Sequence, residues 1–181
     1  MSALDAALMI LVVHGALGAF DTLYCHEWQA RLPRQPWAGP ELRLHSLRSF
    51  LYAAIFLGLA WFEWHGAFSW LLFTLFAIEY VVTLIDARVE DRTRRLSRAE
   101  RLTHMILGAT TGAYFALVAY HASLEWIPAP TQLQFTSHGA VSLVLTLYGA
   151  SVVISAVRDI FASRQLGLAR GNNERAERVE R

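Results

Sequence analysis

The chain has 181 residues, of which 55% are hydrophobic and 17% are charged, and its mean hydropathy is +0.33. An ordinary soluble domain carries about 25% charged residues, so this composition argues against a disordered chain and against a typical water-soluble enzyme. A single cysteine excludes an intrachain disulfide, and with it a disulfide-rich scaffold. The composition therefore indicates a membrane protein, and the length corresponds to about one domain.

Five segments are apolar over nearly the ~20 residues that a helix needs to cross the hydrocarbon core of a bilayer. In chain order they are Ala3–Tyr24, Leu47–Trp64, Ala67–Ile85, Leu102–Leu124 and Ser137–Phe161. The start of the chain lacks the basic residues of a secretory signal, so we expect the first segment to be retained as a span. We predict an all-α polytopic membrane protein with five transmembrane helices, a transmembrane domain at 1–163 and a polar cytoplasmic tail at 164–181.

The basic residues are distributed asymmetrically about these spans. All sixteen are arginines: four lie between positions 31 and 48, six between 88 and 101, and six from 158 onward. These stretches all lie on one side of the predicted spans, and by the positive-inside rule that side faces the cytoplasm. We therefore expect a protein of the bacterial inner (cytoplasmic) membrane with its N-terminus outside and its C-terminus in the cytoplasm. Its expected partner is the lipid bilayer, and we expect no nucleic-acid partner.

Two stretches of the chain resemble each other. Each begins with two adjacent residues of which at least one is an acid, and an Arg-Leu turn follows. A glutamate and a histidine four positions apart, Glu-x-x-x-His, then open the next span. The residues are His26, Glu27, Glu41 and His45 in the first copy, and Glu90, Asp91, Glu100 and His104 in the second. The pattern predicts a four-helix bundle of two repeated hairpins, at about 3–64 and 67–124, with a fifth helix at about 137–161.

The repeated residues are of types that bind metal. Residues four apart lie on one helical face, and the helical rise places both Glu-x-x-x-His pairs level with the acids that end the preceding spans. Four helices would thus bring carboxylates and imidazoles to one cytoplasmic-side layer, where two divalent cations would balance four negative charges. The predicted metal ligands are Glu27, Glu41, His45, Glu90, Asp91, Glu100 and His104. The choices between His26 and Glu27 and between Glu90 and Asp91 stay open.

Other ionisable residues lie deeper in the predicted spans, where they are costly and therefore candidates for function. We expect them to form a second layer around the metals, with His14 facing Glu79 across the bundle. The residues of this layer are His14, Asp21, His26, Glu79 and Asp86.

The ligand inventory resembles that of the di-iron and di-manganese carboxylate proteins of the ferritin-like type. The resemblance covers ligand types and symmetry, because those proteins use Glu-x-x-His whereas this chain separates the two residues by four positions. It implies two metal ions, iron first and manganese or zinc as alternatives. It also implies an oxidoreductase that acts on a hydrophobic small molecule, such as a lipid or quinone, with an electron donor. The chain is similar as well to small polytopic bacterial membrane proteins with paired motifs of this kind.

Two other functions fit parts of the sequence. An inner pair, His45 with His104, and an outer pair, His121 with His138, would each supply two axial ligands to a haem b in a transmembrane electron carrier. Alternatively, the deeper ionisable residues would continue a polar path through the bilayer, as in a metal-ion transporter or sensor.

A purely structural role also accounts for some of the residues. Ser97 and Glu100 have the spacing of a helix capping box, and Glu41 follows Pro40 as a favourable acid in a first helical turn. These contributions need no metal, so an assembly subunit without any site stays among the alternatives.

Overall fold

The computed structural model describes residues 1–179 and the side chains of residues 1–169. Within this range the chain is mostly helical. The elements are α1 (Ala3–Phe20), the π-helix η1 (Asp21–Ala30), the 3-10 helix η2 (Leu32–Arg34), α2 (Gly39–Trp61), β1 (Phe62–His65), α3 (Ala67–Thr93), α4 (Arg98–His121), the π-helix η3 (Ala122–Trp126), β2 (Gln132–Phe135) and α5 (Ala140–Val179).

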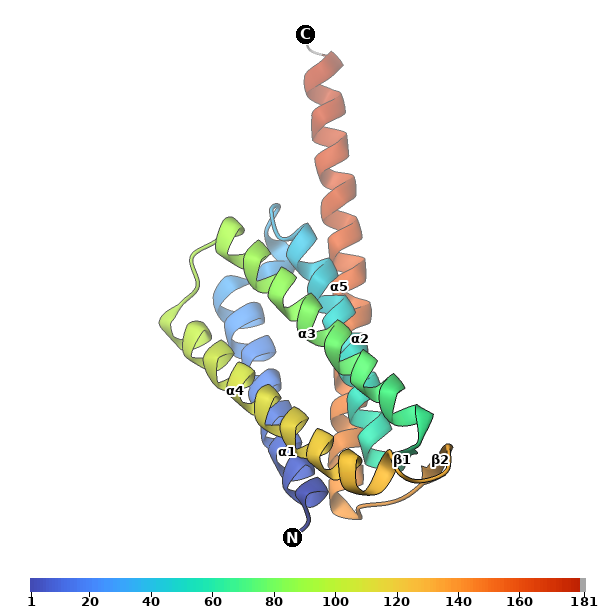
Figure 1. Ribbon diagram of the computed structural model, residues 1–181. Coiled ribbons are helices and arrows are strands. Elements are labelled where there is room, and N and C mark those ends of the chain that lie inside the picture. The colour runs from blue at the N-terminus through green and yellow to red at the C-terminus, as the bar shows by residue number, and fades with distance from the viewer. Residues whose placement is uncertain (180–181) are drawn as a thin grey trace.

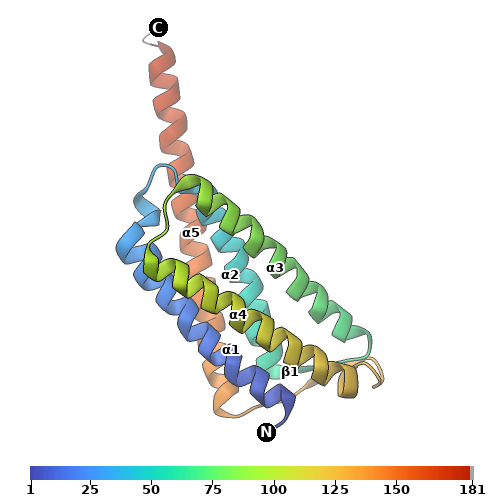
Figure 2. The ribbon, with the colours of Figure 1, turned by 60° about the vertical axis from the view of Figure 1, so that its left-hand side comes forward.

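The long helices form one bundle in which α1 packs against α4, while α2 packs against both α3 and α5 (Figures 1 and 2). Apolar residues three or four positions apart make the inner faces, as with Leu4, Leu8 and Leu11 of α1. The predicted repeat halves correspond to the hairpins α1–α2 and α3–α4. Among these four helices, the main contacts join one hairpin to the other, α1 with α4 and α2 with α3. The fifth helix also belongs to the bundle, because α5 and α2 make the most extensive helix contact.

The outward faces of the helices are also apolar. Within the described residues, five helices are long and apolar enough to cross a membrane. Trp70, Met105 and Leu147 are examples of large side chains that are more than 60% exposed on them. A helix that is hydrophobic all round is typical of a membrane span, and these exposed apolar side chains fit such a location.

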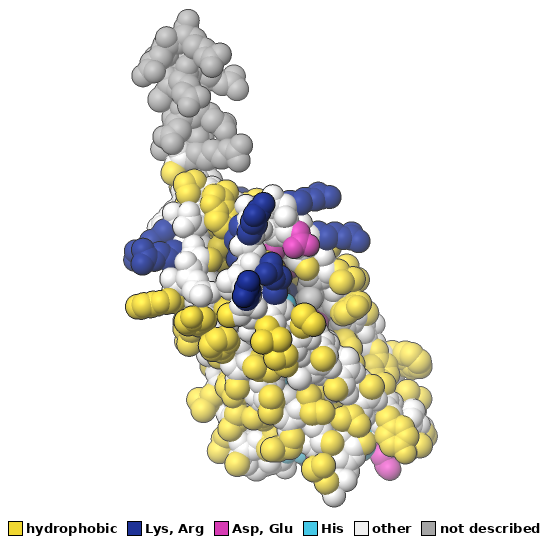
Figure 3. Space-filling view, turned by 90° about the vertical axis from the view of Figure 1, so that its left-hand side faces the viewer, with side chains coloured by type: hydrophobic (Ala, Val, Ile, Leu, Met, Phe, Trp, Pro, Cys, Tyr) yellow, Lys and Arg dark blue, Asp and Glu magenta, His cyan; other side chains and the backbone are white. Residues whose placement is uncertain are grey.

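The arginines gather at one end of the bundle. This arginine-rich end comprises the loop at 31–38, the loop at 94–97 and the part of α5 from Arg158 onward. On the face shown in Figure 3, basic side chains lie near the end from which α5 extends, and hydrophobic side chains predominate over the rest. The C-terminus extends from this end, and the N-terminus lies at the opposite one (Figure 1).

A small sheet closes that opposite end, where the predicted spans Leu47–Trp64 and Ala67–Ile85 are only two residues apart in the sequence. Strands β1 and β2 pair antiparallel, with Phe62 opposite Phe135 and His65 opposite Gln132. Phe135 also stacks on the ring of Trp61, whose indole N–H donates to Thr146 Oγ1 at 2.8 Å. The sheet thus ties the end of α2 to the segment that precedes α5.

Gly66 occupies the turn between β1 and α3, with φ of +57° and ψ of −126°. A Cβ atom at this position would lie 2.7 Å from Cα of Thr131. We expect Gly66→Ala to lower the free energy of unfolding by about 1–3 kcal/mol, because both the backbone conformation and the contact are unfavourable for alanine. Thermal unfolding in detergent measures the effect, with Gly39→Ala, which meets open space, as the control. Equal melting temperatures for the two variants would contradict the prediction.

Candidate metal centre

Four buried or partly buried side chains converge inside the bundle near the arginine-rich end. They are His26 of η1, Glu90 of α3, and Glu100 and His104 of α4. Each offers one ligand atom, and these atoms all lie within 4.8 Å of one another. We call this group the four-donor cluster.

A π-helical segment determines which side chain of the first pair faces inward. In η1, backbone hydrogen bonds link residues five apart, so Asp21 and His26 lie about one turn apart and are both buried. The next residue, Glu27, faces away from the cluster and forms an ion pair of 2.7 Å with Arg158. The structure therefore brings His26 into the cluster and leaves Glu27 out of it.

The regular helical spacing of α3 determines which member of the second pair, Glu90 or Asp91, faces the cluster. Buried positions on this helix recur every three or four residues, and they include Asp86 and Glu90. Glu90 is 1% exposed, whereas the neighbouring Asp91 lies on the exposed side of the helix. Glu90 is thus the member of this pair that joins the cluster.

The contacts within the cluster leave polar atoms unsatisfied. Nε2 of His26 lies 3.3 Å from Oε1 of Glu100 and 4.0 Å from Oε1 of Glu90, and Nδ1 of His104 lies 3.5 Å from Oε2 of Glu90. Both ring nitrogens of His26 and Oε1 of Glu90 are buried and lack a hydrogen-bond partner among the described residues. Buried polar atoms without partners are costly, so each such atom calls for an explanation.

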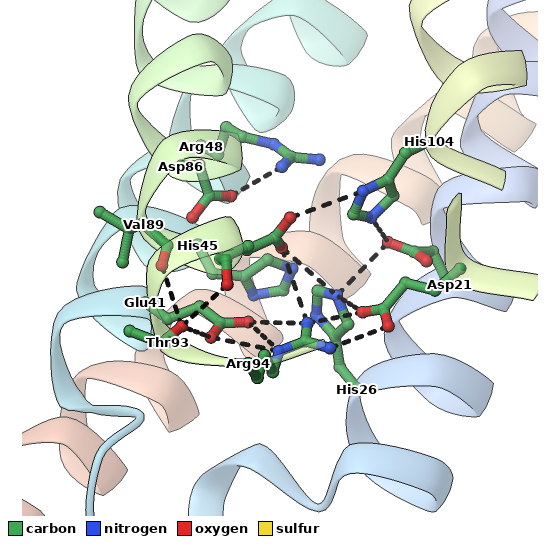
Figure 4. A network of polar contacts seen from close by, with 12 residues as sticks. Asp21, His26, Glu41, His45, Arg48, Asp86, Val89, Thr93, Arg94 and His104 are labelled. Carbon is green, nitrogen blue, oxygen red and sulfur yellow. Dashed lines mark hydrogen bonds and ion pairs between the residues drawn. The ribbon is translucent and has the colours of Figure 1, made fainter. Parts of the chain in front are cut away.

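Arg94 joins the cluster to Glu41, the acid of the first Glu-x-x-x-His pair (Figure 4). Its guanidinium donates to both carboxylate oxygens of Glu100, at 2.6 and 2.8 Å, and to Oε1 of Glu41 at 2.8 Å. Burial by itself lowers the pKa of Arg94, but the hydrogen bonds to Glu100 and Glu41 outweigh this effect and raise its pKa above the ordinary value. Arg94 is therefore a permanent cation, and Glu41 binds it instead of joining the four donors.

The charges around Arg94 favour one further cation. Glu41, Glu90 and Glu100 are each at most 2% exposed, and all three have an oxygen within 3.8 Å of the Arg94 guanidinium. When ionised, these three carboxylates and the guanidinium sum to a charge of −2. Asp21, which borders the cluster, would bring the sum to −3, so one divalent ion would balance most of this charge. Two ions were expected from the sequence, and the described side chains form a single group of three or more potential ligands. Arg94 thus provides one positive charge at a site where a second metal ion was expected from the sequence.

Ser97 and Glu100 have different roles in the first turn of α4. Ser97 Oγ accepts a hydrogen bond from the backbone N–H of Glu100 at 3.1 Å, as an N-cap residue does. The Glu100 carboxylate points instead at Arg94 and His26. The cap thus fixes the first turn of α4 and leaves its acid free for the cluster.

His45 lies beside the cluster and binds a residue of the fifth helix. Its Nδ1 lies 2.7 Å from Oδ2 of the fully buried Asp159. The ring of His26 lies 4.9 Å from that of His45 and 6.4 Å from that of His104. A third imidazole, that of His26, therefore lies close to both proposed inner haem ligands, and a macrocycle between them would require His26 to move. At the other end of the bundle, His121 packs edge-on against Trp126.

The predicted second layer is present in part. Asp21 borders the cluster, with Oδ2 at 3.2 Å from Nε2 of His104 and 3.6 Å from Nε2 of His26. Asp86 pairs with Arg48 at 2.8 Å. His14 and Glu79 do not pair with each other as expected. Each instead contacts a threonine hydroxyl, His14 that of Thr110 at 2.8 Å and Glu79 that of Thr83 at 2.6 Å.

Comparison of the chain with known protein families, with curated proteins and with solved structures gives no match. The site must therefore be interpreted from its own geometry.

Two contributors to the site are missing from the sequence-based prediction. Asp159 is the single acid between positions 137 and 161, and an isolated acid in an apolar span is a signal that identifies such residues. Arg94 is one of six arginines within fourteen positions, and nothing in that run distinguishes it from its neighbours. Its role becomes visible only when its contacts are known.

Proposed function

We propose that the protein is a membrane-embedded metalloprotein whose four-donor cluster binds one divalent transition-metal ion. The observation that carries this proposal is the convergence of His26, Glu90, Glu100 and His104 with unsatisfied buried nitrogen and oxygen atoms at its centre. An ion about 2.1 Å from each of the four donors would satisfy one ring nitrogen of His26 and Oε1 of Glu90 after small movements of the side chains.

The same proposal places the cluster near the cytoplasmic face of a bilayer. Five long apolar helices with exposed apolar side chains support a membrane location. The gathering of arginines at one end supports a cytoplasmic position for that end, by the positive-inside rule. The cluster lies near this end, in the parts of η1, α3 and α4 closest to the arginine-containing loops.

The donor set favours iron, manganese or zinc, because imidazole and carboxylate ligands together suit these ions. With iron or manganese the ion would supply redox chemistry, and we propose an oxidoreductase that acts on a hydrophobic molecule. His26, Glu90, Glu100 and His104 would hold the ion directly. Arg94 would keep the Glu100 carboxylate ionised and oriented, and Asp21 would orient the His104 imidazole through its other ring nitrogen, as outer-shell carboxylates do at metal sites.

The surroundings of the cluster favour a fixed site over a transport path. Towards the opposite end of the bundle, the shared core consists largely of apolar side chains such as Leu8, Leu11, Phe56, Leu72 and Val118. An ion moving through the bilayer would have to cross this layer without ligands, which is costly. The geometry therefore supports retention of the ion in the cluster.

Elemental analysis of protein purified in mild detergent tests the proposal. We expect about one iron, manganese or zinc ion per chain, and no Soret band in the visible spectrum. Removing the ion with a chelator should lower the melting temperature, because an ion bound only to the folded state stabilises it. Protein without bound metal that also takes up no ion on reconstitution, and whose melting temperature is insensitive to metal, would refute it.

A further inference from the structure

A lateral cavity of about 280 Å³ lies beside the four-donor cluster, between α1, α2 and α5. This volume is near the lower end of the ~300–1,000 Å³ found for small-molecule sites. Leu23 and Ile154 line it and are 65% and 71% exposed, so the cavity reaches the apolar outer surface of the bundle. A ligand could therefore enter sideways from the membrane.

Aromatic rings form much of the inner wall. The rings of His14 and Tyr52 lie 5.2 Å apart, and Tyr148 of α5 is another lining residue, whose ring lies 5.9 Å from that of Phe56. Tyr148 packs so closely on α1 that a Cβ on Gly15 would lie 2.6 Å from its Cε2 atom. These rings give the cavity flat apolar surfaces suited to a planar ring.

The polar floor of the cavity carries almost no free positive charge. Two arginines line it, but Arg48 pairs with Asp86 at 2.8 Å, and Arg158 pairs with Glu27 at 2.7 Å and Asp159 at 2.6 Å. The two arginines that could bind an anionic headgroup are thus already neutralised by carboxylates. It would also meet the carboxylate of Asp21.

Asp21 is the group that connects the cavity with the cluster. It is 3% exposed and lines the cavity, and its Oδ1 has no hydrogen-bond partner among the described residues. Its other oxygen, Oδ2, contacts His104 and His26 of the cluster. A small rotation of the Asp21 side chain would turn Oδ1 towards the cavity. A ligand hydroxyl that donates to Oδ1 would then satisfy this buried acceptor and would lie one side chain away from the metal ligands.

We propose that this cavity binds the headgroup of a neutral hydroquinone with an apolar tail. The ring would lie against His14, Tyr52 and Tyr148, one hydroxyl would donate to Asp21, and the tail would leave the bundle past Leu23 and Ile154. Binding follows from the cavity alone, whereas the use of this ligand as a substrate rests on the proposed metal function.

A binding measurement with a cavity-filling variant tests the proposal. The probe is a benzohydroquinone with a decyl tail, titrated calorimetrically into protein in phosphatidylcholine nanodiscs. Gly18 lines the cavity and has open space where a side chain would begin, so Gly18→Leu should fill it and raise the Kd at least tenfold. Gly112→Leu is the matched control, because its side chain also meets open space but lies on α4 outside the cavity, and its Kd should stay within twofold of the wild-type value.

Other outcomes would overturn the proposal. These are the absence of saturable binding to the wild-type protein, equal loss in both glycine variants, and binding of decanoate as tight as that of the hydroquinone. If Gly18→Leu does not elute as a single folded species, Ser151→Phe fills the cavity from α5 and takes its place, with the same expected loss. Titrations on chelator-treated and metal-loaded protein separate the two proposals, because hydroquinone binding without any metal uptake would refute the metal function and leave the cavity site intact.

Discussion

Replacing Glu90 with glutamine is expected to reduce metal binding by at least about 100-fold, whereas Asp91→Asn should leave it unchanged. Loss of outer-shell partners alone typically costs about 10–100-fold in metal affinity, and Glu90 is placed as a direct ligand. Its carboxylate contacts His104 and lies near His26, with one oxygen unsatisfied. Glutamine keeps the shape of this side chain but removes its negative charge. Metal content per chain, measured after equilibration with a limiting metal buffer, gives the affinities.

Asp91 provides a closely matched control for Glu90. It is the adjacent residue on the same helix and loses the same charge, but it lies on the exposed side of α3. Any general effect of lowering the local negative charge would appear in both variants. Equal metal content in Glu90→Gln and in wild-type protein would remove Glu90 from the site. Equal loss in both variants would show that the cluster attracts ions only through its total charge.

The sequence predicted the kinds of residues at the site better than their partners. The apolar segments correspond to the five long helices, because hydropathy and length reflect the requirements of a membrane span directly. The Glu-x-x-x-His pairs predicted that Glu100 and His104 act together, because four residues in a regular helix return to the same face. Both inferences depend on local spacing, which the sequence contains.

The parts that could not be predicted depend on irregular or distant structure. The π-helical hydrogen bonding of η1 changes the residues that share a face, so His26 turns inward and Glu27 outward, a choice that the sequence left open. Glu41 and Glu100 were expected to hold metal equally, as equivalent positions of two hairpins. The loop at 94–97 brings Arg94 between them, and a contact across 53 positions in sequence leaves no periodic signal. Asp159 likewise meets His45 across 114 positions.

Loss of the Arg94 side chain should strongly destabilise the protein. Its side chain is 9% exposed and forms ion pairs with Glu41 and Glu100, which are nearly fully buried. Removing one partner of a buried ion pair typically costs about 3–5 kcal/mol, because a buried charge is left uncompensated. We expect Arg94→Ala to lose about this much stability in metal-free protein, measured by thermal or denaturant unfolding in detergent. Arg95→Ala removes the neighbouring exposed arginine and should have little effect.

The reason for this loss can be tested separately from its size. If uncompensated carboxylates cause it, then Glu41→Gln should restore part of the stability of Arg94→Ala although it destabilises the wild-type chain, since it removes one of the unpaired charges. Divalent manganese or zinc should also raise the melting temperature of Arg94→Ala more than that of the wild-type protein, because the vacated position faces three carboxylates and can accept a cation. Additive losses in the double variant, together with equal effects of metal on both proteins, would instead mean that Arg94 acts through packing. In that case the charge balance that assigns one ion to this site would no longer hold.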